Sequence, residues 1–283
     1  VSGAINTAST TGNGGTVSLN AGRNLTINGA INTSAIAGYG GAVILSAAEN
    51  ITTQGINTSS VAGNAGRIEM TSVAGVVNTR GGALDATSQT GNGGSVAIAG
   101  GSGILSGWID AYSINGLGGN IQLSSQSGGI DTTSGGLQTY SFTNNGGDIN
   151  LTAVGNILTA YVDSSSENGR GGNIGFLSRN GSINTSIGDG ILYSYTFDRE
   201  GGNVTLDASG DVITGTIDAA SDFANGGNIF LTSRTGSIDT TRGDLLSWVA
   251  TLDPRGGNGG NVTLRAATNI QVAGIRSDGG LAG

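Results

Sequence analysis

The chain has 283 residues and a net charge of −8; only 11% of its residues are charged, 55 are glycine, and none is cysteine or histidine. The acidic balance and the lack of a basic cluster exclude nucleic acid as an expected partner, because phosphate binding depends on lysine and arginine. Disulfides and zinc–thiolate sites are excluded, and no apolar run reaches the ~18 residues that membrane insertion needs.

The dominant feature of the sequence is an internal repeat. A glycine pair (once Ala-Gly) followed by x-[Val/Ile]-x-[Leu/Ile/Met/Phe] recurs at intervals of 25 to 33 residues. The copies begin at Gly14, Gly40, Ala65, Gly93, Gly118, Gly146, Gly171, Gly201, Gly226 and Gly259. From Gly40 onward short and long units alternate, which indicates that a two-coil unit has been duplicated.

Each short unit predicts three short strands. In the unit that begins at Gly40, apolar residues alternate along 43–47, which is typical of a strand with one buried face. Ile51 and Ile56 mark two further strands. The first strands of four units supply the residues expected to form a core column: Val43, Leu45, Val204, Leu206, Ile229, Leu231, Val262 and Leu264.

The long units keep the first strand and then diverge. Variable stretches follow, such as residues 188–200 and 243–258, and all the length variation is assigned to them. We expect these stretches to project from one side of the molecule as lengthened turns or extra strand pairs.

A unit of this length cannot enclose a core alone, so the units must stack. If each strand pairs with its counterpart in the next unit, every backbone group finds a partner along a common axis. No segment has the periodicity of a helix. The sequence therefore predicts an all-β parallel β-helix (β-solenoid) of about ten coils of 25–33 residues, with three short strands each, over residues 1–283 as a single continuous segment. The absence of capping elements favours a piece of a longer repeat protein.

Glycine and asparagine recur at fixed places in the repeat. No lysine or helix follows the glycine pair, so a phosphate-binding loop is excluded and a tight corner with positive φ is predicted. The asparagines that follow the pair are expected to form a hydrogen-bonded ladder, and they are Asn120, Asn173, Asn203, Asn228 and Asn261. Asp in the turns is expected to be solvated, with incidental Ca²⁺ between stacked carboxylates as the alternative; no cofactor is otherwise predicted.

Aromatic residues concentrate in the long units. The main candidates are Tyr140, Phe142, Tyr193, Tyr195, Phe197 and Trp248. They either cover the core beneath projecting turns or form an exposed strip for lateral association or sugar stacking.

Catalysis has little support in the sequence. The usual nucleophilic triads need histidine, which is absent. The densest charged cluster, formed by Asp189, Asp198, Arg199 and Glu200, is interpreted as a polar loop. We therefore assign no catalytic or metal-binding residue and expect no enzyme activity; a polysaccharide-degrading β-helix is a remote alternative.

The stretches GGTVSLNAGRNLTINGAINTSA, beginning at Gly14, and GGNVTLDASGDVITGTIDAAS, beginning at Gly201, carry a family resemblance. The coil pattern is similar to that of filamentous haemagglutinin-like exoproteins secreted by two-partner systems, and is closest to the Gly/Asn/Thr-rich repeats of cyanobacterial members. The resemblance covers essentially the whole chain. It implies a right-handed β-helix, export to the cell surface, and a role in adhesion, matrix or surface fibres.

These observations favour a structural, self-associating fibre protein located outside the cell. An adhesin that binds cell-surface glycans is the alternative. The expected partners are other copies of the chain and, in the alternative, glycans.

Overall fold

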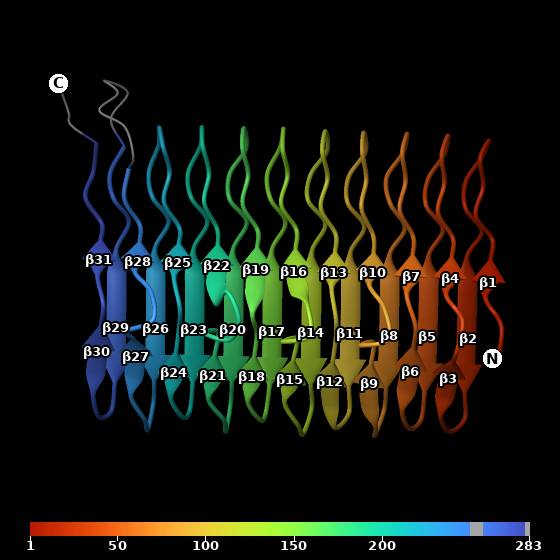
Figure 1. The fold of residues 1–283 in the computed structure, drawn as a ribbon, viewed down its shortest axis with the longest axis horizontal. Coiled ribbons are helices and arrows are strands. Elements are labelled where there is room, and N and C mark those ends of the chain that lie inside the picture. The colour runs from red at the N-terminus through yellow and green to blue at the C-terminus, as the bar shows by residue number, and fades with distance from the viewer. Residues whose placement is uncertain (250–256, 281–283) are drawn as a thin grey trace.

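The chain winds as one continuous coil of β-strands, and the computed structural model describes residues 1–249 and 257–280 (Figure 1). Each turn of the coil contributes one strand to each of three parallel sheets that run the length of the rod. The described part of the chain forms no helix, and therefore none that is apolar and long enough to cross a membrane. The predicted β-solenoid of about ten coils is confirmed.

The first sheet contains the longest strands, each of five residues. Its ten members are β2 (Val17–Ala21), β5 (Val43–Ala47), β8 (Ile68–Ser72), β11 (Val96–Gly100), β14 (Ile121–Ser125), β17 (Ile149–Ala153), β20 (Ile174–Ser178), β23 (Val204–Ala208), β26 (Ile229–Ser233) and β29 (Val262–Ala266). Equivalent residues pair from coil to coil, as Leu151 pairs with Phe176 and Phe176 with Leu206. Period-two alternation therefore stacks one apolar column inside the rod.

The second sheet is made of shorter strands that follow a turn after the first sheet. They are β3 (Leu25–Ile27), β6 (Ile51–Thr53), β9 (Val76–Asn78), β12 (Gly103–Leu105), β15 (Ile130–Asp131), β18 (Ile157–Leu158), β21 (Ile183–Asn184), β24 (Val212–Ile213), β27 (Ile238–Thr240) and β30 (Ile270–Val272).

The third sheet closes the triangular body of each coil. Its strands are β1 (Ile5–Asn6), β4 (Ile31–Asn32), β7 (Ile56–Asn57), β10 (Leu84–Asp85), β13 (Ile109–Asp110), β16 (Gly136–Gln138), β19 (Tyr161–Asp163), β22 (Ile191–Tyr193), β25 (Ile217–Asp218), β28 (Leu245–Leu246) and β31 (Ile275–Arg276). One apolar residue of each strand faces the interior; for example, Ile109 is buried while Asp110 lies on the outer face.

The predicted core column is confirmed. The buried members are Val43, Leu45, Val204, Leu206, Ile229 and Leu231. In β29, Val262 and Leu264 are partly buried and pack against the same core. Because strands of all three sheets point one side inward, a single apolar core runs along the rod axis.

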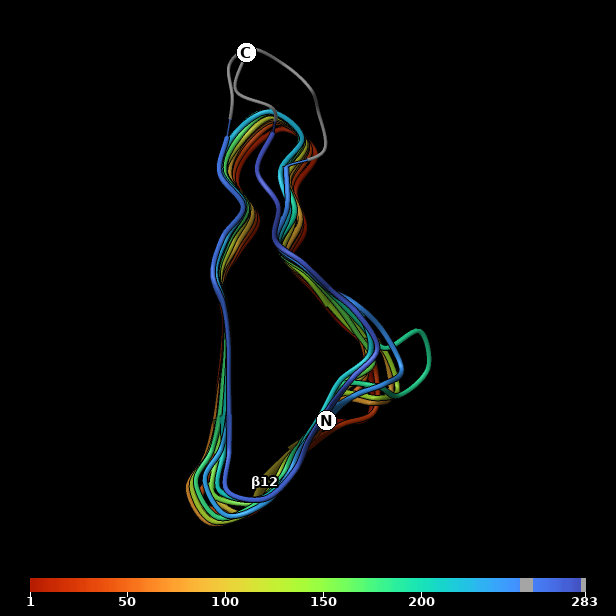
Figure 2. The same ribbon diagram turned by 90° about the vertical axis from the view of Figure 1, so that its left-hand side faces the viewer.

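A narrow lobe, here called the head, joins each third-sheet strand to the first-sheet strand of the next coil, as in residues 33–42 (Figure 2). At its base the two chain segments approach closely, and the Gly41 amide donates to the Thr33 carbonyl at 2.7 Å. A Cβ on Gly40 would lie 1.9 Å from the Thr58 carbonyl oxygen, and one on Gly41 would lie 2.3 Å from the Gly15 carbonyl oxygen.

The prediction that the glycine pair needs positive φ is wrong. Among the described residues only Gly188 and Gly190 have positive φ, and both lie in the β21–β22 turn. The pair is required because backbone passes so close to backbone at the base of the head that no side chain fits.

Side-chain ladders tie successive coils together. The amide nitrogen of Asn203 donates to Asn173 Oδ1 at 3.0 Å, and that of Asn228 donates to Asn203 Oδ1 at 2.9 Å. This confirms the predicted asparagine ladder. Inside the head, Ser113 Oγ donates to the Gly91 carbonyl at 2.6 Å and accepts from the Gly116 amide at 2.8 Å. Such contacts satisfy backbone groups that the pairing of strands leaves free.

The extra residues of the long units lie elsewhere than predicted. One extra residue lengthens the turn between the first-sheet and second-sheet strands, as pairing of Val43 with Ile68 and of Ile51 with Val77 shows. Others lengthen the turns between second-sheet and third-sheet strands, and the β21–β22 turn at residues 185–190 projects furthest (Figure 2). The variable stretches contain ordinary third-sheet strands rather than extra strand pairs, since Leu192 and Tyr193 of β22 pair in register with β25. The remaining extra residues of the longest unit fall at 250–256, outside the described residues.

Candidate functional site

The outer face of the third sheet carries the most varied side chains of the rod. Strand pairing aligns them in columns, because Asp85 pairs with Asp110 and Asp110 pairs with Gln138. The residue that precedes the inward apolar residue of each strand also points outward, as does the residue three positions after that apolar residue, for example Tyr112 after Ile109. Three outward columns therefore run parallel to the rod axis.

Aromatic rings fill the middle of this face. The rings of Tyr112 and Tyr140 stack with centroids 4.5 Å apart and an interplanar angle of 11°. Trp108 lies 6.1 Å from Tyr161, and Tyr161 lies 6.0 Å from Tyr193, again between ring centroids. Rings from coils one or two steps apart are neighbours in space although they lie far apart in the sequence.

Carboxylates lie between these rings. Asp85 Oδ1 accepts from the amide and the hydroxyl of Thr87, at 3.0 and 2.8 Å. Asp110 has no such contact, and its buried Oδ1 has no hydrogen-bond partner within the described chain. Burial, reinforced by the charge of Asp85, raises the pKa of Asp110 to about 6.

This pKa predicts a dependence of stability on pH. The folded chain holds the Asp110 proton more tightly than the unfolded chain, so the contribution is present at low pH and is lost as the pH rises from about 4 through about 6. Asp110→Asn should remove the loss and raise the free energy of unfolding at pH 7 by about 1 kcal/mol, a value reduced for solvent screening. Urea unfolding of both proteins at pH 4 and pH 7 measures it. The same pH dependence in both proteins would show that Asp110 is not its source.

The predicted contact residues separate into two groups. Tyr140, Tyr193 and Tyr195 are half-buried on or beside third-sheet strands, and Trp248 lies against Arg276, whose guanidinium carbon is 3.3 Å from the ring centroid. The second group, Phe142 and Phe197, lies on the head and is exposed. None of these residues lies in a lengthened turn, so their predicted place in projecting insertions is wrong.

The exposed group belongs to an apolar row on one side of the head. This row, here called the head stripe, consists of Ile36, Val61, Ile114, Phe142 and Phe197. Successive members occupy equivalent positions, because the amide of Ile114 bonds to the Ser88 carbonyl of the preceding coil just as that of Phe142 bonds to Ser113. Polar residues, among them Glu167, take the same position in other coils.

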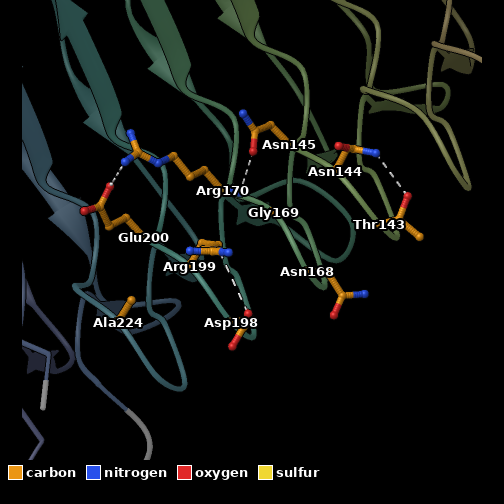
Figure 3. A pocket seen from close by; sticks show the side chains of 10 residues that line it. All are labelled: Thr143, Asn144, Asn145, Asn168, Gly169, Arg170, Asp198, Arg199, Glu200 and Ala224. Atoms are coloured by element: carbon orange, nitrogen blue, oxygen red, sulfur yellow. Dashed lines mark hydrogen bonds and ion pairs between the residues drawn. The ribbon is translucent and has the colours of Figure 1, made fainter. Parts of the chain in front are cut away.

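A polar cavity of ≈ 500 Å³ opens at the tip of the head (Figure 3). Arg170 bridges to Glu200 at 2.9 Å, and Arg199 lies 3.9 Å from Asp198. Asp189, which the sequence placed with these residues, lies instead in the β21–β22 turn at the opposite end of the third-sheet strand. The predicted charged cluster is therefore two separate features. In the described ranges no group of three or more acidic side chains is arranged to hold a metal ion.

A shallow depression lies on the outer face of the third sheet, in the coils that precede Trp108. It has a volume of ≈ 380 Å³ and crosses β4, β7 and β10. Small residues, Ala30, Gly55 and Ala83, leave the space open, and polar residues line one side of it. Because Leu84 pairs with Ile109, the column that contains Ala83 continues directly to Trp108.

No family model, curated protein or solved structure matches this chain. The functional interpretation therefore depends on the surfaces described above. Sequence reasoning did not single out the depression, although the signal was present: each of three successive third strands is preceded by Ala or Gly and ends in Asn or Asp.

Proposed function

We propose that this chain is a non-enzymatic shaft segment of an extracellular fibre or matrix protein that associates laterally with other copies of itself. The observation that carries the proposal is the uniform register, in which equivalent residues pair through all ten first-sheet strands. A rod of this kind repeats its side surface once per coil, and so offers many equal contacts along its length.

The head stripe is the surface that we assign to lateral contact. Phe142 is 52% exposed and Phe197 is 42% exposed, and aligned apolar side chains of this kind usually mark a contact surface. Another β-solenoid has the same spacing of about 4.8 Å between coils, so a second copy of the rod matches the stripe over its whole length. The low fraction of charged residues, 11%, limits repulsion between copies.

The similarity of the repeat to filamentous haemagglutinin-like exoproteins supports an extracellular location. Secretion by a two-partner system and a role at the cell surface are part of the same proposal. Adhesion to glycans is a second function, and the depression on the third sheet favours it.

The double variant Phe142→Glu/Phe197→Glu tests the lateral contact. We expect the parent protein to form bundles in electron micrographs and a fast-sedimenting fraction, and the variant to form single rods. Adding charge to an apolar contact opposes association, and both side chains lie outside the core.

Phe230→Glu is the matched control, because Phe230 is 39% exposed on the first sheet, away from the head. It should leave bundling unchanged, and circular dichroism should show the same β-structure in all three proteins. Single rods of the parent protein at every concentration, or bundles of the double variant, would contradict the proposal.

A further inference from the structure

We propose that the depression on the third sheet binds a neutral, β-1,4-linked glycan chain, with Trp108 at one end of the bound chain. This binding names the ligand of the glycan adhesion proposed above, on which it rests, and it is independent of the head stripe. Three features of the depression favour such a ligand: its shape, the hydrogen-bonding groups beside it, and the charge around it.

The shape is set by small residues in one outward column. Ala30, Gly55 and Ala83 line the depression, and the next member of the column is Trp108. The Trp108 ring leans away from the depression, over Gly136 of the next coil, where an added Cβ would lie 2.5 Å from the ring, and 43% of the residue is exposed. A flat, largely apolar floor with an exposed indole just beyond its end suits a sugar ring, which presents an apolar face to aromatic side chains.

The polar groups beside the floor are already oriented. Asn32 Oδ1 accepts from the Ser34 amide at 3.1 Å, and Asn57 Oδ1 accepts from the amide and hydroxyl of Ser59 at 2.9 and 2.7 Å. These bonds hold each side-chain amide in one orientation. Within the described chain, neither Nδ2 donates a hydrogen bond, so two N–H donor groups are available at adjacent strands.

Asp85 is the third polar residue in the row beside the floor, after Asn32 and Asn57. Its Oδ1 is used by Thr87, whereas its Oδ2 makes no hydrogen bond or ion pair in the described residues. The row thus offers donors from Asn32 and Asn57 and a charged acceptor from Asp85. A sugar hydroxyl both donates and accepts, so it can pair with either kind of group. Groups that are fixed before binding lose little entropy when the ligand arrives.

The regular spacing of the row favours a polymer over a single sugar. Equivalent groups recur every ~4.8 Å along the axis. A β-1,4-linked chain is extended and ribbon-like, and can therefore lie straight across successive strands. The carboxylates of Asp85 and Asp110 and the net charge of −8 disfavour acidic polysaccharides.

Calorimetry and tryptophan fluorescence test the proposal with cellohexaose, mannohexaose and xylohexaose as probes. The chain has two tryptophans, so Trp248→Phe leaves Trp108 as the only indole reporter. We expect at least one hexasaccharide to bind with a Kd on the order of 10⁻⁴ M, as befits a shallow site, and to change the Trp108 emission. Oligogalacturonate should bind at least ~10-fold more weakly.

Two variants locate the site by calorimetry. Trp108→Ala should weaken binding about 10-fold through loss of stacking. Gly55→Leu should abolish it by filling the depression; a Cβ at Gly55 would lie 3.4 Å from the Ala83 carbonyl oxygen, so the coil can accommodate the change. Phe230→Ala removes an exposed ring from the first sheet and should leave binding unchanged.

Failure of all three neutral hexasaccharides to bind at millimolar concentration would overturn the proposal. Unchanged affinity in Gly55→Leu would also overturn it, because binding would then occur elsewhere. The head-stripe double variant should bind glycan as the parent does, so loss of bundling and loss of glycan binding are separate outcomes.

Discussion

Gly119→Ala should lower the free energy of unfolding by more than about 3 kcal/mol, because the new methyl group has no space. A Cβ at Gly119 would lie 2.2 Å from the Gly94 carbonyl oxygen and 2.7 Å from its carbonyl carbon. Both atoms belong to the backbone of the preceding coil, so relief requires the coils to separate at the base of the head. Urea unfolding followed by circular dichroism measures the loss.

Gly103→Ala is the matched control for this substitution. A Cβ at Gly103 would lie 3.5 Å from the nearest backbone oxygen, an ordinary contact. Alanine there restricts the unfolded chain, so stability should stay the same or rise by up to about 1 kcal/mol. Equal losses in the two variants would show that close approach of the coils does not explain the glycine pair.

Phe176→Ala should cost about 3–5 kcal/mol, the range expected when a buried aromatic side chain is deleted from a core. Phe176 is 1% exposed and pairs with Leu151 and Leu206 in the coils on either side. The cavity would therefore lie within the continuous core, with little freedom for the flanking strands to close it. The same unfolding measurement in urea provides the comparison.

Two further variants test whether a cavity in the core causes the loss of stability. Phe176→Leu restores the residue found at this position in both neighbouring coils, so it should cost only about 1 kcal/mol. Leu177→Ala changes the adjacent residue, which faces outward and is only partly buried, and should cost less than about 1 kcal/mol. A loss at Leu177 as large as that at Phe176 would contradict the inward assignment of the Phe176 column.

The local pattern of the sequence was enough to predict the strands of the first sheet and their inward column. Val204 and Leu206 alternate with polar residues, and that period is a direct signal of one buried face. The asparagine ladder followed from the same repeat. The role of the glycine pair did not, because a glycine in a sequence does not distinguish a positive φ from a close approach between distant segments.

The third sheet of the long units was missed because its strands have two or three residues and no alternation of their own. Leu192 is assigned to a strand only through its pairing with Val162 and Ile217 in neighbouring coils. Without that register, Tyr193 and Tyr195 looked like parts of an insertion. Alignment of the units on the third strand instead of the glycine pair places Tyr112, Tyr140 and Tyr195 in one column.

The direction of the backbone hydrogen bonds has a mechanical consequence for the rod. The bonds between coils run along the rod axis, so tension on the rod would load them one coil at a time instead of shearing many together. A peeled coil such as the 25 residues from Gly146 to Arg170 can stretch to roughly 80 Å. Stacked in the rod, the same coil occupies only about 4.8 Å of length. A rod built in this way would yield gradually under load and absorb energy as it lengthens.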